Sequence, residues 1–90
     1  MKDYLMDQFN LTEKQFNKLT VQHRIILDYI ACFGSITPME AFQYLKITKL
    51  ATRISEMKVI GIQFDQVYES RKNSDGRTVR YMRYRKAAAA

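Results

Sequence analysis

The 90-residue sequence predicts an α+β fold, mainly helical, in which a core of three helices is followed by a β-hairpin. Apolar residues repeat with a helical period of about 3.6 up to Gly61 and with a strand-like period of about two after it. A polar stretch that ends in Asp75-Gly76 separates the two alternating segments, and this dipeptide is a typical hairpin turn signal. The composition, 47% hydrophobic and 27% charged, suits one domain with a modest core.

Residues 1–19 are predicted to form a helical extension that precedes the main domain. Apolar pairs at helical spacing and a break around Asn10-Leu11 indicate two short helices, the second capped by Thr12. We expect the apolar side chains to pack on the main domain or on a second copy of the chain, and a homodimer through this segment is the favoured alternative. These side chains are more numerous than in a free tail and include Leu5, Met6, Phe9, Leu11 and Phe16.

The main domain, residues 20–86, is predicted to begin with a scaffold helix over residues 21–33. Thr20 is a suitable N-cap, and Gly34 is a suitable end. The apolar positions of this helix form a wide stripe, which we expect to pack against both helices that follow. The stripe consists of Val21, Ile25, Ile26, Tyr29, Ile30 and Phe33.

The next helix is predicted from Pro38 to about Leu45. Thr37 can cap it, and Glu40 can close a capping box. A further helix is predicted over residues 48–59, after a turn too short for anything but a tight corner, with Thr48 as its N-cap and Gly61 beyond its end. The apolar faces of the two helices would hold Ala41, Phe42 and Leu45 in the first and Leu50, Ala51, Ile54 and Met57 in the second.

Two helices joined by so short a turn form a helix-turn-helix, whose second helix contacts base edges in the major groove. The outward side chains at the start of that helix are therefore candidate DNA contacts, although an ordinary solvated face would have the same composition. These candidates are Thr48, Lys49, Thr52 and Arg53.

The segment after Gly61 is predicted to form the hairpin, with one strand starting at Ile62 and the other running from Thr78 to Arg85. A phase slip near Gln66 indicates a β-bulge, or else a strand boundary other than the predicted one. The short segment Ser35-Ile36 is available as a third strand. Three helices followed by such a hairpin make the winged form of the helix-turn-helix, in which the hairpin is the wing.

The turn of the wing carries side chains that can reach phosphates or the adjacent minor groove. These wing-tip residues are Arg71, Lys72, Asn73 and Arg77. By contrast, the aromatic residues of the two strands are expected to pack on the sheet rather than to stack on bases. They are Tyr68, Tyr81 and Tyr84.

The net charge of +6 is concentrated in the second half of the chain. From Lys46 onward, eleven Lys and Arg stand against four acidic residues, whereas the part before it is close to neutral. Such one-sided charge is typical of a phosphate-binding surface, and solubility is the alternative explanation.

Several kinds of chemistry are not expected. Cys32 is the only cysteine and His23 the only histidine, so no disulfide within the chain and no zinc site can form. We expect Cys32 to be a small buried side chain. No enzyme activity is expected, because the sequence has no paired carboxylates, no phosphate-binding glycine loop and no nucleophile beside a base. No cofactor is expected, and with no signal peptide or membrane span in the sequence we expect a cytoplasmic location in a bacterial host cell.

The segment from Gly34 to Met57 resembles small winged helix-turn-helix proteins encoded by bacteriophages and prophages. Their pattern runs G-S-I-T-P-x-E-A, then L-G-I at the turn, then R-L-A-A-R-I-S-x-L, where this chain has GSITPMEA, LKI and KLATRISEM. Lys46 replaces the turn glycine, which would cost on the order of 1 kcal/mol if that position needs a positive φ. Lys49 and Thr52 differ at outward positions. The resemblance covers roughly residues 20–85 and implies a DNA-binding domain of mobile-element origin.

The expected function is sequence-specific binding of double-stranded DNA by a small phage or mobile-element protein, as a transcription regulator or as an architectural factor. Residues 48–59 would enter the major groove, and the basic wing, residues 70–78, would lie on the backbone or in the minor groove. The alternative is a protein-binding winged helix that inhibits or modulates a host protein. No role is assigned to the alanine-rich tail, residues 87–90.

Overall fold

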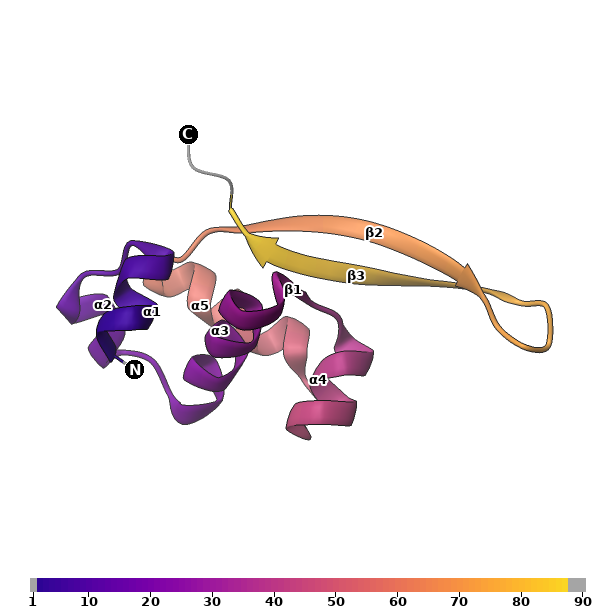
Figure 1. Ribbon diagram of the computed structural model, residues 1–90, viewed down its shortest axis with the longest axis horizontal. Coiled ribbons are helices and arrows are strands. Elements are labelled where there is room, and N and C mark those ends of the chain that lie inside the picture. Colours follow the sequence, from indigo (N-terminus) through magenta and orange to yellow (C-terminus); the bar gives the residue numbers. More distant parts are fainter. Residues whose placement is uncertain (1, 88–90) are drawn as a thin grey trace.

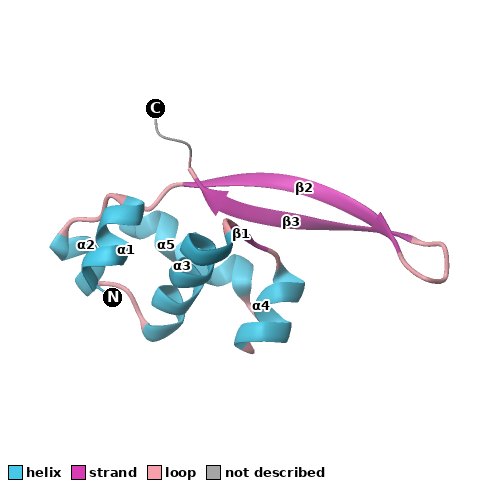
Figure 2. Cartoon of the chain, viewed as in Figure 1, coloured by secondary structure: helices cyan, strands magenta, loops and turns pink. Residues whose placement is uncertain are grey.

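The computed structural model describes residues 2–87, and within them five helices and three strands follow one another along the chain. The helices gather at one end of the long axis, and the turn between the last two strands lies at the other end (Figure 1). Figure 2 shows the same division into a helical body and a projecting hairpin. The predicted fold class, with three core helices, a wing and an N-terminal helical extension, is confirmed. The predicted tail, residues 87–90, lies outside the described residues except for Ala87.

The extension consists of α1 (Lys2–Phe9) and α2 (Glu13–Asn17), and the predicted break between two short helices is confirmed. Three of its apolar side chains, Leu5, Leu11 and Phe16, are buried in the same core as those of the main domain. Packing within the chain therefore accounts for the apolar surplus that motivated a homodimer through this segment. A domain boundary after residue 19 stays a prediction.

Helix α3 (Val21–Phe33) has Thr20 as its N-cap and Gly34, which has a φ of +89°, as its C-cap. Its buried apolar stripe is narrower than predicted and includes Leu27, which was not predicted. Ile26, Leu27 and Ile30 are buried, whereas Val21 and Phe33 are 69% and 71% exposed and Ile25 is 39% exposed. The prediction was wrong for these three residues because only one face of α3 meets the other helices.

Cys32 is also exposed, so the prediction of a buried thiol was wrong. It lies four residues after Asp28 on α3, and its Sγ is 4.0 Å from Oδ1 of that residue.

Helix α4 (Pro38–Leu45) has the predicted capping box: Oγ1 of Thr37 accepts from the backbone N–H of Glu40, and Oε1 of Glu40 accepts from the backbone N–H of Thr37. Ala41 is buried, but Phe42 is 55% exposed, contrary to prediction. The turn after α4 begins with Lys46 at a φ of +59°, the left-handed conformation for which the related pattern has glycine.

Helix α5 (Leu50–Ile60) begins two residues later than predicted, and its N-cap is Lys49, which makes no side-chain capping bond. Thr48 is therefore not the cap. The corner is closed instead by the burial of Ile47 and by its backbone N–H, which donates to the carbonyl oxygen of Ala41 at 3.0 Å. The predicted core residues Leu50, Ile54 and Met57 are buried, whereas Ala51 is exposed.

The sheet contains β1 (Ser35–Ile36), β2 (Phe64–Lys72) and β3 (Thr78–Lys86) in the antiparallel order β1-β3-β2. This arrangement confirms the hairpin and the third strand. The register of β2 and β3 is continuous from Phe64 opposite Lys86 to Lys72 opposite Thr78, so there is no bulge at Gln66. The phase slip arises because β2 begins at Phe64 instead of Ile62 and because its outer half has no buried face to maintain an apolar alternation.

Candidate nucleic-acid interface

The start of α5 presents three of the four side chains that the sequence singled out there. Thr48 and Lys49 lie in the corner before the helix, and Thr52 lies in its first turn. All three are exposed. The structure therefore brings them together on the surface at one end of α5.

The exposed face of α5 continues beyond the predicted residues. Ser55, Lys58 and Val59 are exposed along the same helix, and Val59 is 89% exposed. Sequence reasoning missed Ser55 and Val59, although they follow Thr52 at helical spacing, i+3 and i+7. The side chain of Lys58 donates to Oε1 of Gln66 on β2 and so turns toward the hairpin.

Arg53 lies at the margin of this face, and its side chain is only 27% exposed. Its Nη1 donates to Oε1 of Glu56 at 2.8 Å. The same oxygen lies 2.8 Å from Nε2 of the buried His23 on α3. The hydrogen bond with His23 lowers the pKa of Glu56, and the charge of Arg53 lowers it further, so this carboxylate is ionised at neutral pH.

The second group of candidates lies at the wing tip. Arg71 and Lys72 end β2, Asn73 and Arg77 flank the turn, and all four are exposed. The backbone N–H of Asn73 donates to the carbonyl oxygen of Arg77 at 2.7 Å, which closes the loop. Gly76, with a φ of +87°, makes the turn as the sequence predicted.

Two charged residues near the wing tip modify its potential. Nε of Arg77 lies 3.6 Å from Oδ2 of Asp75, so one cation is partly neutralised. Arg80 on β3, which sequence reasoning did not single out, is exposed and pairs in register with Ser70. It adds a cation to the same region of the hairpin.

The wing tip stands well away from α5 along the long axis (Figure 1), so the structure does not bring the two groups of candidates into contact.

A family model described as a winged helix-turn-helix domain matches residues 21–87, which run from the first residue of α3 to just past β3. The chain belongs to the winged helix-turn-helix family. Membership suggests DNA binding, and the winged helix-turn-helix is typically a fold without enzyme activity. Neither the curated proteins nor the solved structures gave a match.

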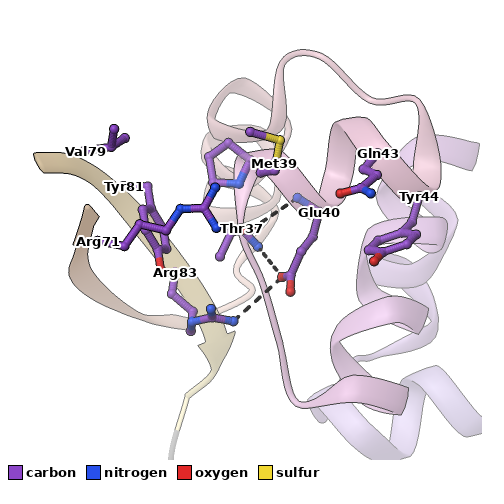
Figure 3. Close-up of a pocket in the computed structure, with 10 residues that line it drawn as sticks. Thr37, Met39, Glu40, Gln43, Tyr44, Arg71, Val79, Tyr81 and Arg83 are labelled. Atoms are coloured by element: carbon purple, nitrogen blue, oxygen red, sulfur yellow. Dashed lines mark hydrogen bonds and ion pairs between the residues drawn. The ribbon is translucent and has the colours of Figure 1, made fainter. Parts of the chain in front are cut away.

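The root of the wing in this winged helix-turn-helix is fixed by Arg83 of β3. Its Nε lies 2.9 Å from Oε2 of Glu69, and its Nη1 donates to Oγ of Ser35 at 2.8 Å. Nη1 also lies 3.7 Å from Oε1 of Glu40, the capping residue of α4 (Figure 3). The hydrogen bond from Arg83 lowers the pKa of Glu69 and raises that of Arg83 itself. Arg83 is thus committed to internal contacts.

A cleft of about 370 Å³ lies between the start of α4 and the hairpin. Met39 and Tyr44 line it from α4, and Arg71, Tyr81 and Arg83 line it from the strands (Figure 3). Its charged lining includes both cations and Glu40.

The three tyrosines of the hairpin have different surroundings. Tyr84 is buried in the core as predicted, and Tyr81 is half-buried. Tyr68 is 71% exposed, so the prediction that it packs on the sheet was wrong. Tyr68 lies on β2, in which no residue is buried.

No helix among residues 2–87 is long and apolar enough to cross a membrane. In the same part of the chain, no three residues of the types His, Cys, Asp and Glu are grouped in a way that could hold a metal ion.

Proposed function

We propose that the chain binds double-stranded DNA with sequence specificity, with α5 in the major groove and the wing tip on the backbone or in the minor groove. The observation that carries the proposal is the placement of the wing cations. Arg71, Lys72 and Arg80 are exposed on a hairpin that projects from the body. Clustered cations on a projecting element are suited to phosphate contacts.

The contacts to base edges would come from the start of α5. Thr48, Lys49 and Thr52 are short or flexible exposed side chains there, and Arg53 lies beside them. Threonine and lysine side chains can bond to base edges, and arginine recognises guanine through two bonds. With the resemblance to phage and prophage proteins, this supports a role as a small transcription regulator or architectural factor of a mobile element, acting in the cytoplasm of the host cell.

Selection of duplex fragments from a random pool, followed by affinity measurements at several salt concentrations, tests the proposal. We expect enrichment of a defined sequence and a steep fall of affinity with salt, because phosphate contacts release counterions. If the pool shows no enrichment and the salt dependence is shallow, the proposed function is wrong.

A second candidate function, binding of a host protein, is favoured by the outward surface of α3. Val21, Ile25 and Phe33 are exposed on it, and they line a groove of about 400 Å³ together with Tyr29. An exposed apolar surface of this kind is typical of protein contacts. A complex formed through it would show little dependence on salt. A homodimer, through residues 1–19 or through this surface, stays a prediction.

A further inference from the structure

The side chain of Arg53 is held in place from a different helix. Its Nη1 bonds to Oε1 of Glu56, one turn further along α5, at 2.8 Å. The same oxygen is 2.8 Å from Nε2 of His23, which lies 33 residues earlier in the chain. One carboxylate oxygen thus links a buried residue of α3 to a cation at the candidate DNA-contacting face.

The tautomer of His23 is fixed by the start of α3. The backbone N–H of Thr20 points to Nδ1 at 3.1 Å, and a backbone amide can only donate, so Nδ1 is the acceptor. The proton of the neutral ring is therefore on Nε2, from which it is donated to Glu56. The ring is only 3% exposed, so its surroundings hold it in this orientation.

Glu56 can hold Arg53 strongly because it is charged. A hydrogen bond between an ionised carboxylate and a guanidinium is stronger than a bond between neutral groups. Nε of Arg53 is buried and has no hydrogen-bond partner among residues 2–87. Burial keeps a ligand away from Nε, so a ligand can reach the guanidinium only through the two terminal nitrogens, one of which, Nη1, already bonds to Glu56.

We propose that His23 and Glu56 are positioning residues that hold Arg53 ready to contact a base, and that the base preference contributed by Arg53 depends on both. The inference rests on the proposed DNA binding. A free arginine loses side-chain freedom when it binds, and holding it in one orientation beforehand reduces that loss. A planar guanidinium held in one orientation also discriminates guanine from other bases better than a mobile one.

The test uses the full-length chain, the duplex that it selects from a random pool, and the same duplex changed at the base pair that Arg53→Ala identifies. Glu56→Ala releases Arg53, and Glu56→Gln keeps an acceptor in the same place. His23→Gln removes the link to α3 but leaves a glutamine that can still close the capping box with Thr20. Thermal melting shows which variants are folded.

Base preference, the ratio of the affinities for the two duplexes, is the quantity measured. Glu56→Ala and His23→Gln should each lower it about tenfold, which corresponds to about 1.4 kcal/mol, and Glu56→Gln should lower it less. Neither Glu56→Ala nor His23→Gln should change the preference further when Arg53 is already alanine, because both substitutions act through that side chain. Glu13→Ala on α2 removes the same charge and should leave the preference unchanged.

Five results would overturn the inference. Folded His23→Gln could keep the full preference, which would mean that His23 does not position Arg53. Folded Glu56→Ala could keep the full preference, or it could lower the preference equally when Arg53 is alanine. Glu56→Ala could also raise the affinity for every duplex with an unchanged ratio, which would make Glu56 only a repelling charge. Finally, Arg53→Ala could change no base preference, which would leave nothing to position. If His23→Gln does not fold, Glu56→Ala decides alone. A wild-type chain that selects no duplex would instead refute the proposed function, and this result needs no variant.

Discussion

Arg83 and Glu69 face each other diagonally across the hairpin, with Nε of the arginine 2.9 Å from Oε2 of the glutamate. The same guanidinium bonds to Ser35 on β1 and approaches Glu40 on α4. One side chain therefore connects the root of the wing with both elements that begin the helix-turn-helix. These polar contacts act beside the apolar core, in which Tyr84 of β3 and Ile36 of β1 are buried.

Arg83→Ala should lower the free energy of unfolding by roughly 1–3 kcal/mol, because it leaves two half-buried carboxylates, Glu40 and Glu69, without their common cation. Chemical denaturation measures the change. Arg80→Ala, an exposed arginine on the same strand, is the matched control and should stay within about 0.5 kcal/mol of wild type. Equal effects of the two substitutions would contradict the anchoring role of Arg83.

Combined replacement of Arg71 and Lys72 by alanine should weaken binding to all duplexes similarly. If each cation neutralises one phosphate, the slope of log K against log salt should decrease in magnitude by about two. The control is the double substitution of Lys14 and Lys18, which removes the same charge from the end of the molecule opposite the wing tip. An unchanged slope for the wing variant would remove the wing from the interface.

Leu5→Ala should lower the free energy of unfolding by about 2–5 kcal/mol, because Leu5 is fully buried in the shared core. Asp7→Ala, at an exposed position of the same helix, should have little effect. Thermal melting distinguishes these outcomes, and sedimentation of the wild-type chain tests the homodimer independently. Wild-type stability of Leu5→Ala would mean that residues 1–19 are an independent appendage, as the predicted boundary implies.

Lys46→Gly should leave stability unchanged or raise it by up to about 1 kcal/mol. The left-handed conformation costs a residue with a side chain about 1–2 kcal/mol, and the greater freedom of glycine in the unfolded chain offsets part of the gain. Gly34→Ala is the opposite experiment, since an added Cβ there would meet nothing within 4 Å and only the φ of +89° opposes it. It should be destabilising, and a stabilised Gly34→Ala protein would show that the backbone shifts.

Stability should fall as the pH drops below about 4.5, because Glu56 and Glu69 have lowered pKa values in the folded protein. A carboxyl whose folded pKa lies below its unfolded pKa stabilises the fold above the unfolded value, and this contribution disappears as the pH falls through the folded pKa. Glu69→Gln should therefore reduce the loss of stability on acidification. Denaturation at pH 7 and at pH 3 measures it, and an identical loss in the variant would contradict the role of Glu69.

Local signals in the sequence predicted most of the fold. The capping box of Thr37 and Glu40, the helix ends at Gly34 and Gly61 and the turn at Gly76 each depend on residues within a few positions of one another, and such signals can be read without tertiary structure. The third strand was predicted only as a use available to the short segment Ser35-Ile36, and the structure shows it as β1.

Features that depend on tertiary packing were predicted less well. The exposure of Val21 and Phe33 depends on which face of α3 the other helices cover, and periodicity alone does not reveal the width of that face. The start of α5 depends on the burial of Ile47 rather than on a good capping residue at position 48. The candidate site was predicted least well, because Glu56, which bonds to Arg53, is also bonded to His23 of α3, and no local pattern relates these two helices.

The length of the wing can be compared with the helical repeat of DNA. Each of its long strands has nine residues, which at about 3.3 Å per residue makes roughly 30 Å from root to tip. One turn of B-DNA rises by about 34 Å. If the proposed DNA binding holds, the length of the hairpin is close to one helical repeat of the duplex. This length, rather than any one side chain, would then set the size of the footprint.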